Sequence, residues 1–358
     1  MLTKSEKWLR NISDRSYIAL LLVIAVLRVG PSPVGAPWVG WVYDAARAFP
    51  SSANYISYSP LPVMIAKILG QPNVVIWWML FSALLFVWFV LVMYKLKSLF
   101  PDHYRIVQLL FAASQIIMLQ STFIGHYDNI SVIAASLVFL WSSPWLIYLA
   151  AFLAAGANPY MSFATGVCVV VLYCGTRANR HLKIGLIYST VSLAVLVGSH
   201  FWMDAPTGGT RESIVLGELF SVIRGSIGIW SFIFLSVLGP LWFIFTWFIV
   251  QRESAFGQIG LVQKFLIFMG VAGIPMGMSF FILDRTRLGV VVGFLPLFLY
   301  ILPELKRALG KLSELNAIKF PVLSGGILIW ILYPAVIVDT AGVFRLPIAK
   351  YISLMFGS

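Results

Sequence analysis

About eleven runs of mostly apolar residues, separated by short polar breaks, are the feature that most constrains how this chain folds. A helix needs about 20 mostly apolar residues to cross the roughly 30 Å hydrocarbon layer of a bilayer. We therefore expect the runs to cross a membrane as helices, although several of the middle ones are short for a span. The runs cover approximately Ser16–Val29, Val74–Tyr94, Ile106–Phe123, Ile130–Trp141, Trp145–Ala157, Ser162–Cys174, Ile184–Trp202, Ile227–Val250, Phe265–Leu283, Leu288–Leu302 and Phe320–Val338.

The composition excludes the soluble alternatives. Of the 358 residues, 60% are apolar and only 11% are charged, and the mean hydropathy is +0.92. Ordinary globular domains are roughly 45–50% apolar and about 25% charged. Cys168 and Cys174 lie in or at the end of an apolar run, which suits buried thiols better than a disulfide framework. The predicted fold is an all-α, polytopic transmembrane helix bundle of about 11 spans, forming a single domain over residues 1–358.

The charge distribution predicts how the bundle is oriented. The chain has 25 Lys and Arg against 13 Asp and Glu, an excess that membrane topology and contacts with anionic lipids explain without a nucleic-acid partner. Lys4, Lys7, Arg10 and Arg15 precede the first run, and no small-residue cleavage signature is present, so we expect a retained helix with a cytoplasmic N-terminus. Alternation from that start places most basic residues inside, as the positive-inside rule requires.

The same alternation places the unusual polar segments on the outer face. The first outer loop covers about residues 30–73, and Trp38 to Phe49 within it shows the spacing of an amphipathic helix in the headgroup layer. Asp44 is the only carboxylate of this loop. Its two interpretations are a general base at the bilayer surface and a structural partner of Arg47 or of a helix cap.

A second outer segment, Gly125-His-Tyr-Asp-Asn129, packs four polar side chains between two apolar runs. Ionisable groups at membrane depth are functional candidates by default. We expect His126 to act as a hydrogen-bonding group or proton shuttle and Asp128 as an orienting carboxylate or base. The alternative is that Asp128 or Asn129 only caps the following helix.

The third outer segment is Asp284-Arg-Thr-Arg287. The planar fork of arginine matches phosphate oxygens, and two arginines around one carboxylate leave a positive charge for a ligand. Arg285 and Arg287 are therefore predicted to bind phosphate. The alternative is that Asp284 pairs with one arginine and the other anchors the helix at the interface.

The sequence lacks the motifs of several classes of enzyme and ATP-driven transporter. The sequence has no Walker loop, no dinucleotide-binding glycine pattern after a strand, no His-Glu-x-x-His and no Gly-x-Ser-x-Gly. His103, His181 and His200 have no metal-ligand spacing, so we predict neither a structural metal nor a cofactor. The alternative is a divalent ion held between Asp44 and Asp128.

The outer segments, taken in order, resemble those of the multi-spanning GT-C type glycosyltransferases that use polyprenyl-phosphate sugars. The resemblance covers most of the chain and rests on several short segments: Val42-Tyr-Asp-Ala-Ala-Arg-Ala48, Tyr58-Ser-Pro-Leu-Pro62, Gly125-His-Tyr-Asp-Asn129, Asn158-Pro-Tyr160 and the stretch from Asp284 to Pro296. It implies a membrane helix bundle whose first outer loop forms surface helices over the active site. Ala157 and Asn158 stand where such enzymes often have a lysine before the proline, so phosphate binding would rest on Arg285 and Arg287.

The resemblance implies an inverting transfer of a sugar from a polyprenyl-phosphate donor to a lipid-linked or cell-envelope glycan acceptor. The residues expected to act in catalysis are Asp44, Asp128 and His126, and those expected to bind substrate are Arg285, Arg287, Tyr127, Asn129, Tyr58 and Asn158. We expect the bacterial inner membrane, with the active site outside the cytoplasm, because the C-terminal Met-Phe-Gly-Ser carries no retention signal. The alternatives are a flippase or transporter of lipid-linked glycans, a polymerase, and a non-catalytic subunit that keeps the fold.

Overall fold

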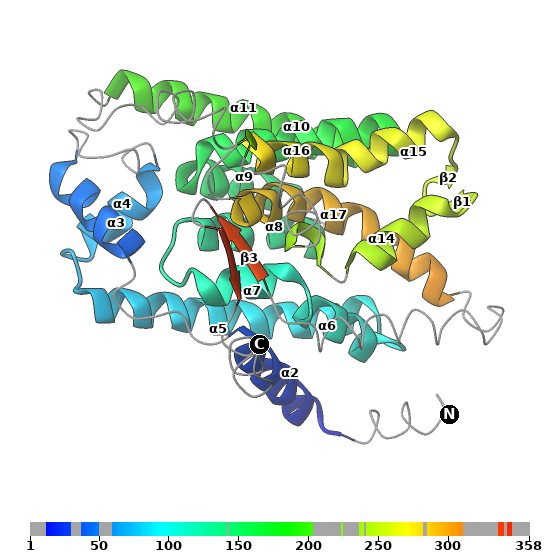
Figure 1. The fold of residues 1–358 in the computed structure, drawn as a ribbon, viewed down its shortest axis with the longest axis horizontal. Coiled ribbons are helices and arrows are strands. Elements are labelled where there is room, and N and C mark those ends of the chain that lie inside the picture. Colours follow the sequence, from blue (N-terminus) through cyan, green and yellow to red (C-terminus); the bar gives the residue numbers. More distant parts are fainter. Residues whose placement is uncertain are drawn as a thin grey trace.

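A computed structural model shows a bundle that is mostly helical (Figure 1). It describes residues 12–29, 37–49, 59–141, 143–202, 223–224, 236–239, 241–281, 285–310, 336–339 and 342–345. Five helices in these ranges are long and apolar enough to cross a membrane, within Val74–Leu99, Pro159–Thr176, Asn179–Phe201, Leu261–Ser279 and Thr286–Gly310. The chain is therefore an all-α bundle with the helices of a membrane protein, and the described residues support five spans of the expected eleven.

The described elements follow one another in a simple order. They are α2 (Asp14–Val29), α3 (Pro37–Ala48), α4 (Pro60–Ile68), α5 (Val74–Leu99), α6 (Tyr104–Ala112), α7 (Gln115–Thr122), α8 (Asp128–Leu140), α9 (Pro144–Ala157), α10 (Pro159–Thr176), α11 (Asn179–Trp202), α14 (Leu241–Val250), β1 (Glu253–Ser254), β2 (Gly257–Gln258), α15 (Leu261–Phe268), the π-helix η2 (Met269–Gly273), α16 (Ile274–Phe281), α17 (Arg285–Gly310), β3 (Val336–Asp339) and β4 (Gly342–Arg345).

Two of the predicted apolar runs are interrupted in the structure. The run from Ile106 forms α6 and α7, which separate at Ala113 and Ser114. The run from Phe265 forms α15, η2 and α16, with a π-helical turn in the middle. The first interruption coincides with the polar pair Ser114-Gln115, and the second lies in apolar sequence, where hydropathy gives no sign of it.

The structure differs from the prediction at the end of the last predicted span. The sequence places Phe320–Val338 in a helix, but Val336–Asp339 forms strand β3 of an antiparallel hairpin with β4. Residues 336–338 are β-branched, Val-Ile-Val, which favours an extended strand. The earlier part of that run lies outside the described residues, as do residues 227–235 of the eighth run.

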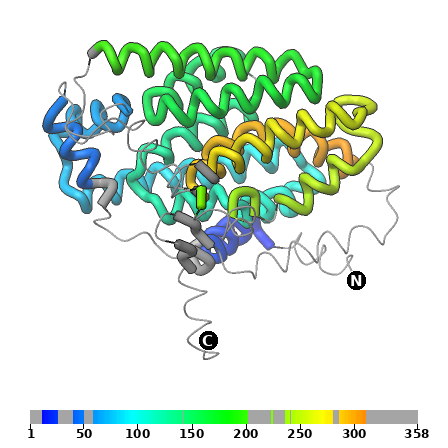
Figure 2. Tube along the Cα trace, turned by 45° about the horizontal axis from the view of Figure 1, so that its top comes forward, coloured from blue at the N-terminus to red at the C-terminus, as the bar shows by residue number. Residues whose placement is uncertain are grey.

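Helix α17 forms the centre of the bundle. In Figures 1 and 2 it runs between α10 and α11 on one side and α5 and α6 on the other, and 94% of its most apolar window is buried. An all-round apolar helix is typical of such a position. It passes through Pro296 and Pro303, whose missing N–H groups are tolerated in membrane helices because neighbouring groups compensate.

Glycines allow two of the helices to approach closely. A Cβ atom at Gly166 of α10 would lie 2.7 Å from the backbone nitrogen of Ser189 and 2.9 Å from the carbonyl oxygen of Gly185, both in α11. Because real Cβ atoms essentially never come so near to backbone atoms, only glycine fits here. Small residues at such crossings are the usual means of packing membrane helices.

The segment between the first two predicted spans contains the expected amphipathic helix. In α3 the buried side chains are Val42, Ala45 and Ala46, whereas Trp41 is 43% exposed and Asp44 and Arg47 are also exposed. Helix α3 packs against α4 and α5, and α3 and α4 lie together at one end of the bundle (Figure 2).

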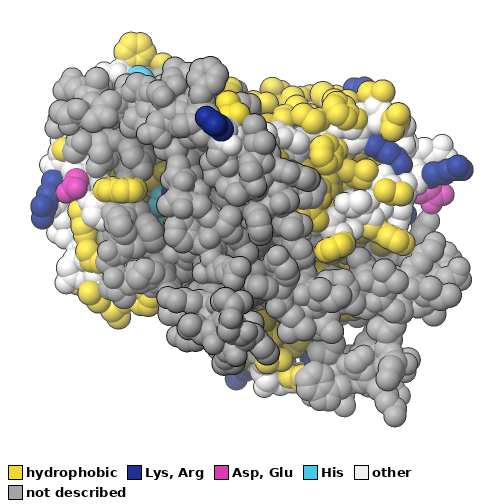
Figure 3. Space-filling model, viewed as in Figure 1, with side chains coloured by type: hydrophobic (Ala, Val, Ile, Leu, Met, Phe, Trp, Pro, Cys, Tyr) yellow, Lys and Arg dark blue, Asp and Glu magenta, His cyan; other side chains and the backbone are white. Residues whose placement is uncertain are grey.

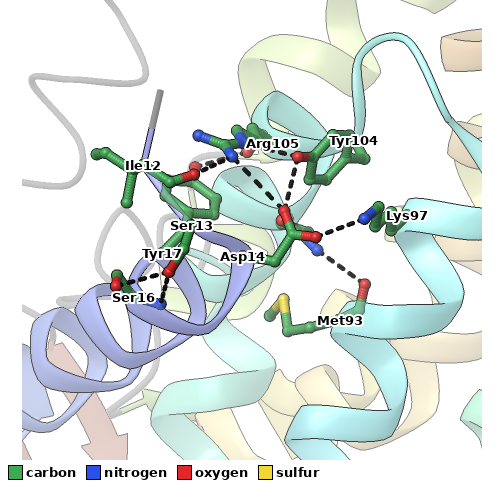
Figure 4. A network of polar contacts seen from close by, with 10 residues as sticks. Ile12, Ser13, Asp14, Ser16, Tyr17, Met93, Lys97, Tyr104 and Arg105 are labelled. Atoms are coloured by element: carbon green, nitrogen blue, oxygen red, sulfur yellow. Dashed lines mark hydrogen bonds and ion pairs between the residues drawn. The ribbon is translucent and has the colours of Figure 1, made fainter. Parts of the chain in front are cut away.

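The opposite end of the bundle carries two polar networks. Asp14 at the start of α2 binds Lys97 of α5, Arg105 of α6 and the hydroxyl of Tyr104 (Figure 4). Glu304, near the end of α17, is fully buried and accepts hydrogen bonds from the Ala255 N–H (2.9 Å) and from Arg307 Nε (3.0 Å). The first network joins α2, α5 and α6, and the second fastens the β1–β2 turn to α17.

The distribution of side chains on the surface also separates charged ends from an apolar middle. On the face drawn in Figure 3, hydrophobic side chains predominate over the upper right, and most described charged side chains lie toward the two ends. Exposed Leu, Val and Phe side chains are expected where a helix faces lipid. The described surface therefore fits a chain whose middle belongs in a bilayer.

Candidate functional site

The turn between α7 and α8 is shaped by one glycine. Gly125 has φ = +86°, in the left-handed region that residues with a Cβ rarely adopt. Its neighbours close the turn, since the His126 N–H donates to the Phe123 carbonyl at 2.9 Å and the Asn129 N–H donates to the His126 carbonyl at 3.1 Å. This geometry turns His126 and Asp128 toward the centre of the bundle, where each is 1% exposed.

The carboxylate of Asp128 is held by groups from three segments. Asn158 Nδ2 donates to its Oδ1 at 3.0 Å, while Arg287 Nε and His126 Nδ1 lie 3.4 Å and 3.2 Å from its Oδ2. Asp128 also begins α8, where the helix dipole favours a negative charge. A carboxylate this deeply buried stays ionised only beside a compensating cation, which Arg287 supplies.

Each ring nitrogen of His126 contacts a charged residue of the cluster. A guanidinium has only donors, so the hydrogen bond from Arg287 Nη1 requires a lone pair on His126 Nε2. His126 Nδ1 lies 3.2 Å from both the backbone nitrogen and the Oδ2 atom of Asp128. His126 thus stands between an anion and a cation and joins them.

Arg287 enters this cluster from the first turn of α17. The guanidinium lies over the rings of Phe123 and Tyr127, with its central carbon 5.7 Å and 5.8 Å from their centroids. Arg287 is 6% exposed. Aromatic faces and one carboxylate are the surroundings in which a buried guanidinium is best tolerated.

Asn158 links the cluster to α10. Its Oδ1 accepts a hydrogen bond from the Met161 N–H at 3.3 Å, which makes it the N-cap of that helix, and Pro159 follows at the first helical position. Its Nδ2 is then free to donate to Asp128. One fully buried amide therefore fixes both the start of α10 and the orientation of the carboxylate.

Two supporting residues were not identified from the sequence. Gln120 of α7 exchanges hydrogen bonds with Asn129, and Trp77 of α5 donates from Nε1 to the Gly125 carbonyl at 3.0 Å. Both lie inside apolar runs. Gln120 is a polar interruption that could have been noticed, whereas nothing in the sequence distinguishes Trp77 from the other tryptophans of its run.

The predicted site residues have different placements in the structure. His126, Tyr127, Asp128, Asn129, Asn158 and Arg287 come together in one buried cluster, with the ring centroids of His126 and Tyr127 3.8 Å apart. Asp44 lies exposed on α3, and the described residues give its carboxylate no hydrogen bond or ion pair with the cluster.

The remaining predicted residues cannot be placed in the site. Arg285 begins α17, but its side chain lies outside the described part of the chain, as do Tyr58 and Asp284. Among the described residues, no group of three or more His, Cys, Asp and Glu side chains is arranged to hold a metal ion.

Comparison of the chain with protein-family models, with curated proteins and with solved structures finds no match.

The cluster is chemically suited to hold charge in a fixed arrangement. It combines an anion, a cation and an imidazole that contacts both of them. Such a buried network is stable only while all members are present, because removal of one leaves a buried charge uncompensated.

Proposed function

We propose that this chain is an integral membrane glycosyltransferase that transfers a sugar from a polyprenyl-phosphate donor to a lipid-linked or cell-envelope acceptor. The observation that carries the proposal is the meeting of His126, Asp128, Asn158 and Arg287 at one end of an apolar bundle. Buried ionisable groups at such a depth are costly and mark substrate sites more often than plain connectors.

The base in this proposal is Asp44. Its side chain is exposed, so its lone pairs are available to a hydroxyl group. The neighbouring Tyr43 donates from its hydroxyl to the Pro72 carbonyl just before α5, and Trp77 in the first turn of α5 bonds to Gly125. Helix α3 and the cluster are thus anchored to the same end of α5.

The reaction would be an inverting displacement. Asp44 removes the proton of the acceptor hydroxyl, whose oxygen attacks the anomeric carbon of the sugar. The bond from that carbon to the phosphate oxygen breaks, and the polyprenyl phosphate leaves with the electron pair. The departing phosphate needs cationic stabilisation more than a proton, and Arg287 and Arg285 would supply it.

The test uses purified protein in nanodiscs with radiolabelled polyprenyl-phosphate sugars and a lipid extract as acceptor. We expect a new labelled product with the wild-type chain, and its loss in Asp44→Asn while the variant still unfolds at the wild-type temperature. Full turnover by Asp44→Asn together with no turnover by Asp128→Asn would move the base to the Gly125–Asn129 turn. Movement of labelled lipid across a vesicle membrane without any product would indicate a flippase instead.

A second candidate is a non-catalytic membrane subunit, and one observation favours it. Both oxygens of Asp128 already face protein groups, and Arg287 is paired with that carboxylate. A cluster occupied in this way can serve stability alone. Neither product nor lipid movement in the assay above, with the fold intact, would support this function.

A further inference from the structure

Helix α4 is apolar on two opposite faces. One face, with Pro62, Val63 and Ala66, is buried inside the protein. On the other face Met64 is 46% exposed and Ile68 is 78% exposed, and residues four positions apart lie on the same side of a helix. A helix with one side in water normally carries polar residues on that side, so the exposed face of α4 is unsuited to water.

Helix α3, which packs against α4, shows the ordinary pattern instead. Its exposed side carries Asp44 and Arg47, and its apolar side, with Val42 and Ala46, is buried. The sequence suggested that α3 would rest on the headgroup layer by its apolar side. Because protein already covers that side, α4 is the helix of this pair whose apolar face can meet lipid.

The turn after α4 is closed by hydrogen bonds and still exposes an apolar side chain. The Gly70 N–H donates to the Lys67 carbonyl at 3.1 Å and the Gln71 N–H donates to the Ala66 carbonyl at 2.8 Å, which is the pair of bonds of a Schellman motif. Gly70 has φ = +70°, the conformation that this motif requires. Leu69, at the C-cap, is 50% exposed, so a hydrogen-bonded turn presents it outward.

The exposed face of α4 leads into the exposed side of α5. The first two turns of α5 expose Val75, Ile76, Met79 and Leu80, and this helix is long and apolar enough to span a bilayer. With Lys95 at one headgroup layer, the other edge of the hydrocarbon falls near Val75, because about 20 residues at 1.5 Å each cover the roughly 30 Å between them. Helix α4 ends a few residues before this point.

The first turn of α4 is held near the same edge by α9. A Cβ atom at Gly156 would lie 3.0 Å from Cβ of Leu61, so α4 packs closely against the end of α9. Helix α10 begins directly afterwards, at Pro159, and is itself long and apolar enough to span. Both ends of α4 therefore lie near one edge of the hydrocarbon layer, and the helix runs along that edge.

The charges around this face suit lipid headgroups. The sequence has no Asp or Glu between Asp44 and Asp102, and Lys67 is the charged residue of α4. Lys67 Nζ donates to the Phe49 carbonyl at 2.8 Å, which leaves its other N–H groups for a phosphate oxygen. A cation beside an apolar face is typical of helices that lie at the boundary between acyl chains and headgroups.

We propose that the face of α4 formed by Met64, Ile68 and Leu69 rests on the bilayer, with these side chains among the acyl chains and Lys67 at the lipid phosphates. The contact would also hold α3 at the membrane surface, because the bond from Lys67 to Phe49 ties the end of α3 to α4. This inference goes beyond the glycosyl transfer proposed above and does not depend on it.

The experiment places an environment-sensitive fluorophore on single cysteines of the full chain in phospholipid nanodiscs. The test variant is Ile68→Cys in a Cys174→Ala background, where Cys168 is buried and should take no label. We expect a blue-shifted emission that nitroxide-labelled phospholipids quench and aqueous iodide does not. Met64→Cys, on the same face, should give the same result and guards against a local effect of the first substitution.

The matched control is Arg47→Cys on the exposed side of α3, which iodide should quench and nitroxide lipids should not. Leu84→Cys, exposed ten residues into α5, should respond most to nitroxides deep in the acyl chain, whereas Ile68→Cys should respond most to shallow ones. Iodide quenching of Ile68→Cys as strong as that of Arg47→Cys would overturn the proposal. Protection from both quenchers would also overturn it, and energy transfer between differently labelled copies would then identify a second copy as the cover.

Discussion

Arg287 of α17 and Asp128 of α8 meet inside the bundle, with Nε of the arginine 3.4 Å from Oδ2 of the aspartate. Each lies in the first turn of its helix. The aspartate is favourably placed with respect to its helix dipole and the arginine unfavourably, so the pair compensates the arginine as well as the buried carboxylate. His126 and Asn158 then fix the geometry of both.

Removing one member of the ion pair should destabilise the protein more than removing both members together. We expect Arg287→Gln or Asp128→Asn alone to lower the free energy of unfolding by about 3–5 kcal/mol, because each change leaves a buried charge or its partners unmatched. The double variant should lose clearly less than the sum of the two. Thermal unfolding in detergent measures this, with Asp44→Asn as an exposed control that changes stability by less than about 0.5 kcal/mol. Additive losses would contradict the coupling.

Asn158 should contribute more to the free energy of unfolding than an ordinary N-cap residue does. Asn158→Ala removes the N-cap of α10 and a hydrogen bond to Asp128, which together should cost about 2–3 kcal/mol. The matched control is Asn73→Ala, since Asn73 caps α5 at an exposed position by accepting from the Ile76 N–H at 2.9 Å. That change should cost about 1 kcal/mol. Equal losses in urea unfolding would show that the Asp128 bond adds nothing.

The glycine contact between α10 and α11 can be tested with two alanine substitutions. At Gly166 the new Cβ would collide with backbone atoms of α11, so Gly166→Ala should destabilise the chain by about 1–3 kcal/mol. At Gly198 of α11 no atom of the described residues lies within 4 Å of the place a Cβ would take, and alanine there should be neutral or stabilising by up to about 1 kcal/mol. Melting temperatures of the two proteins should therefore move in opposite directions or by clearly different amounts. Equal losses in both would argue against a close crossing at Gly166.

The Asp14 network should make stability depend on acid pH. Hydrogen bonds from Lys97 and Tyr104 lower the pKa of Asp14 below its ordinary value, against a smaller opposing effect of burial. Because the folded-state pKa is the lower one, this contribution is present above about pH 4 and is lost as pH falls through the folded-state pKa. The effect should be small, since Lys97 and Asp14 are partly exposed and water screens their attraction.

The control for this effect is Asp14→Asn. Between pH 6 and pH 3 the stability difference between wild type and Asp14→Asn should shrink, because protonation removes from the wild type what the substitution has already removed. Chemical unfolding at several pH values measures it. A difference that stays constant over this range would contradict the role of the network (Figure 4).

The sequence by itself determined the class of the molecule and picked out one polar turn and one arginine that the structure buries together. Apolar runs predict membrane helices because a water-soluble fold of this length could not bury so many apolar residues. Helices α2, α5, α8–α11 and α17 lie where those runs predict helices. The Gly125–Asn129 turn and Arg287 stood out because polar groups are expensive between apolar helices. These are local properties, which composition and spacing record directly.

Only the tertiary structure decided which polar groups meet. Asp128 pairs with Arg287 rather than lying beside Asp44, which is exposed on α3, and Gln120 and Trp77 support the turn from within apolar helices. The structure also shows that α7 packs against α17 and that η2 packs against α10 and α17, next to the two breaks in apolar runs. Contacts between distant segments depend on how helices cross, and hydropathy carries no information about that.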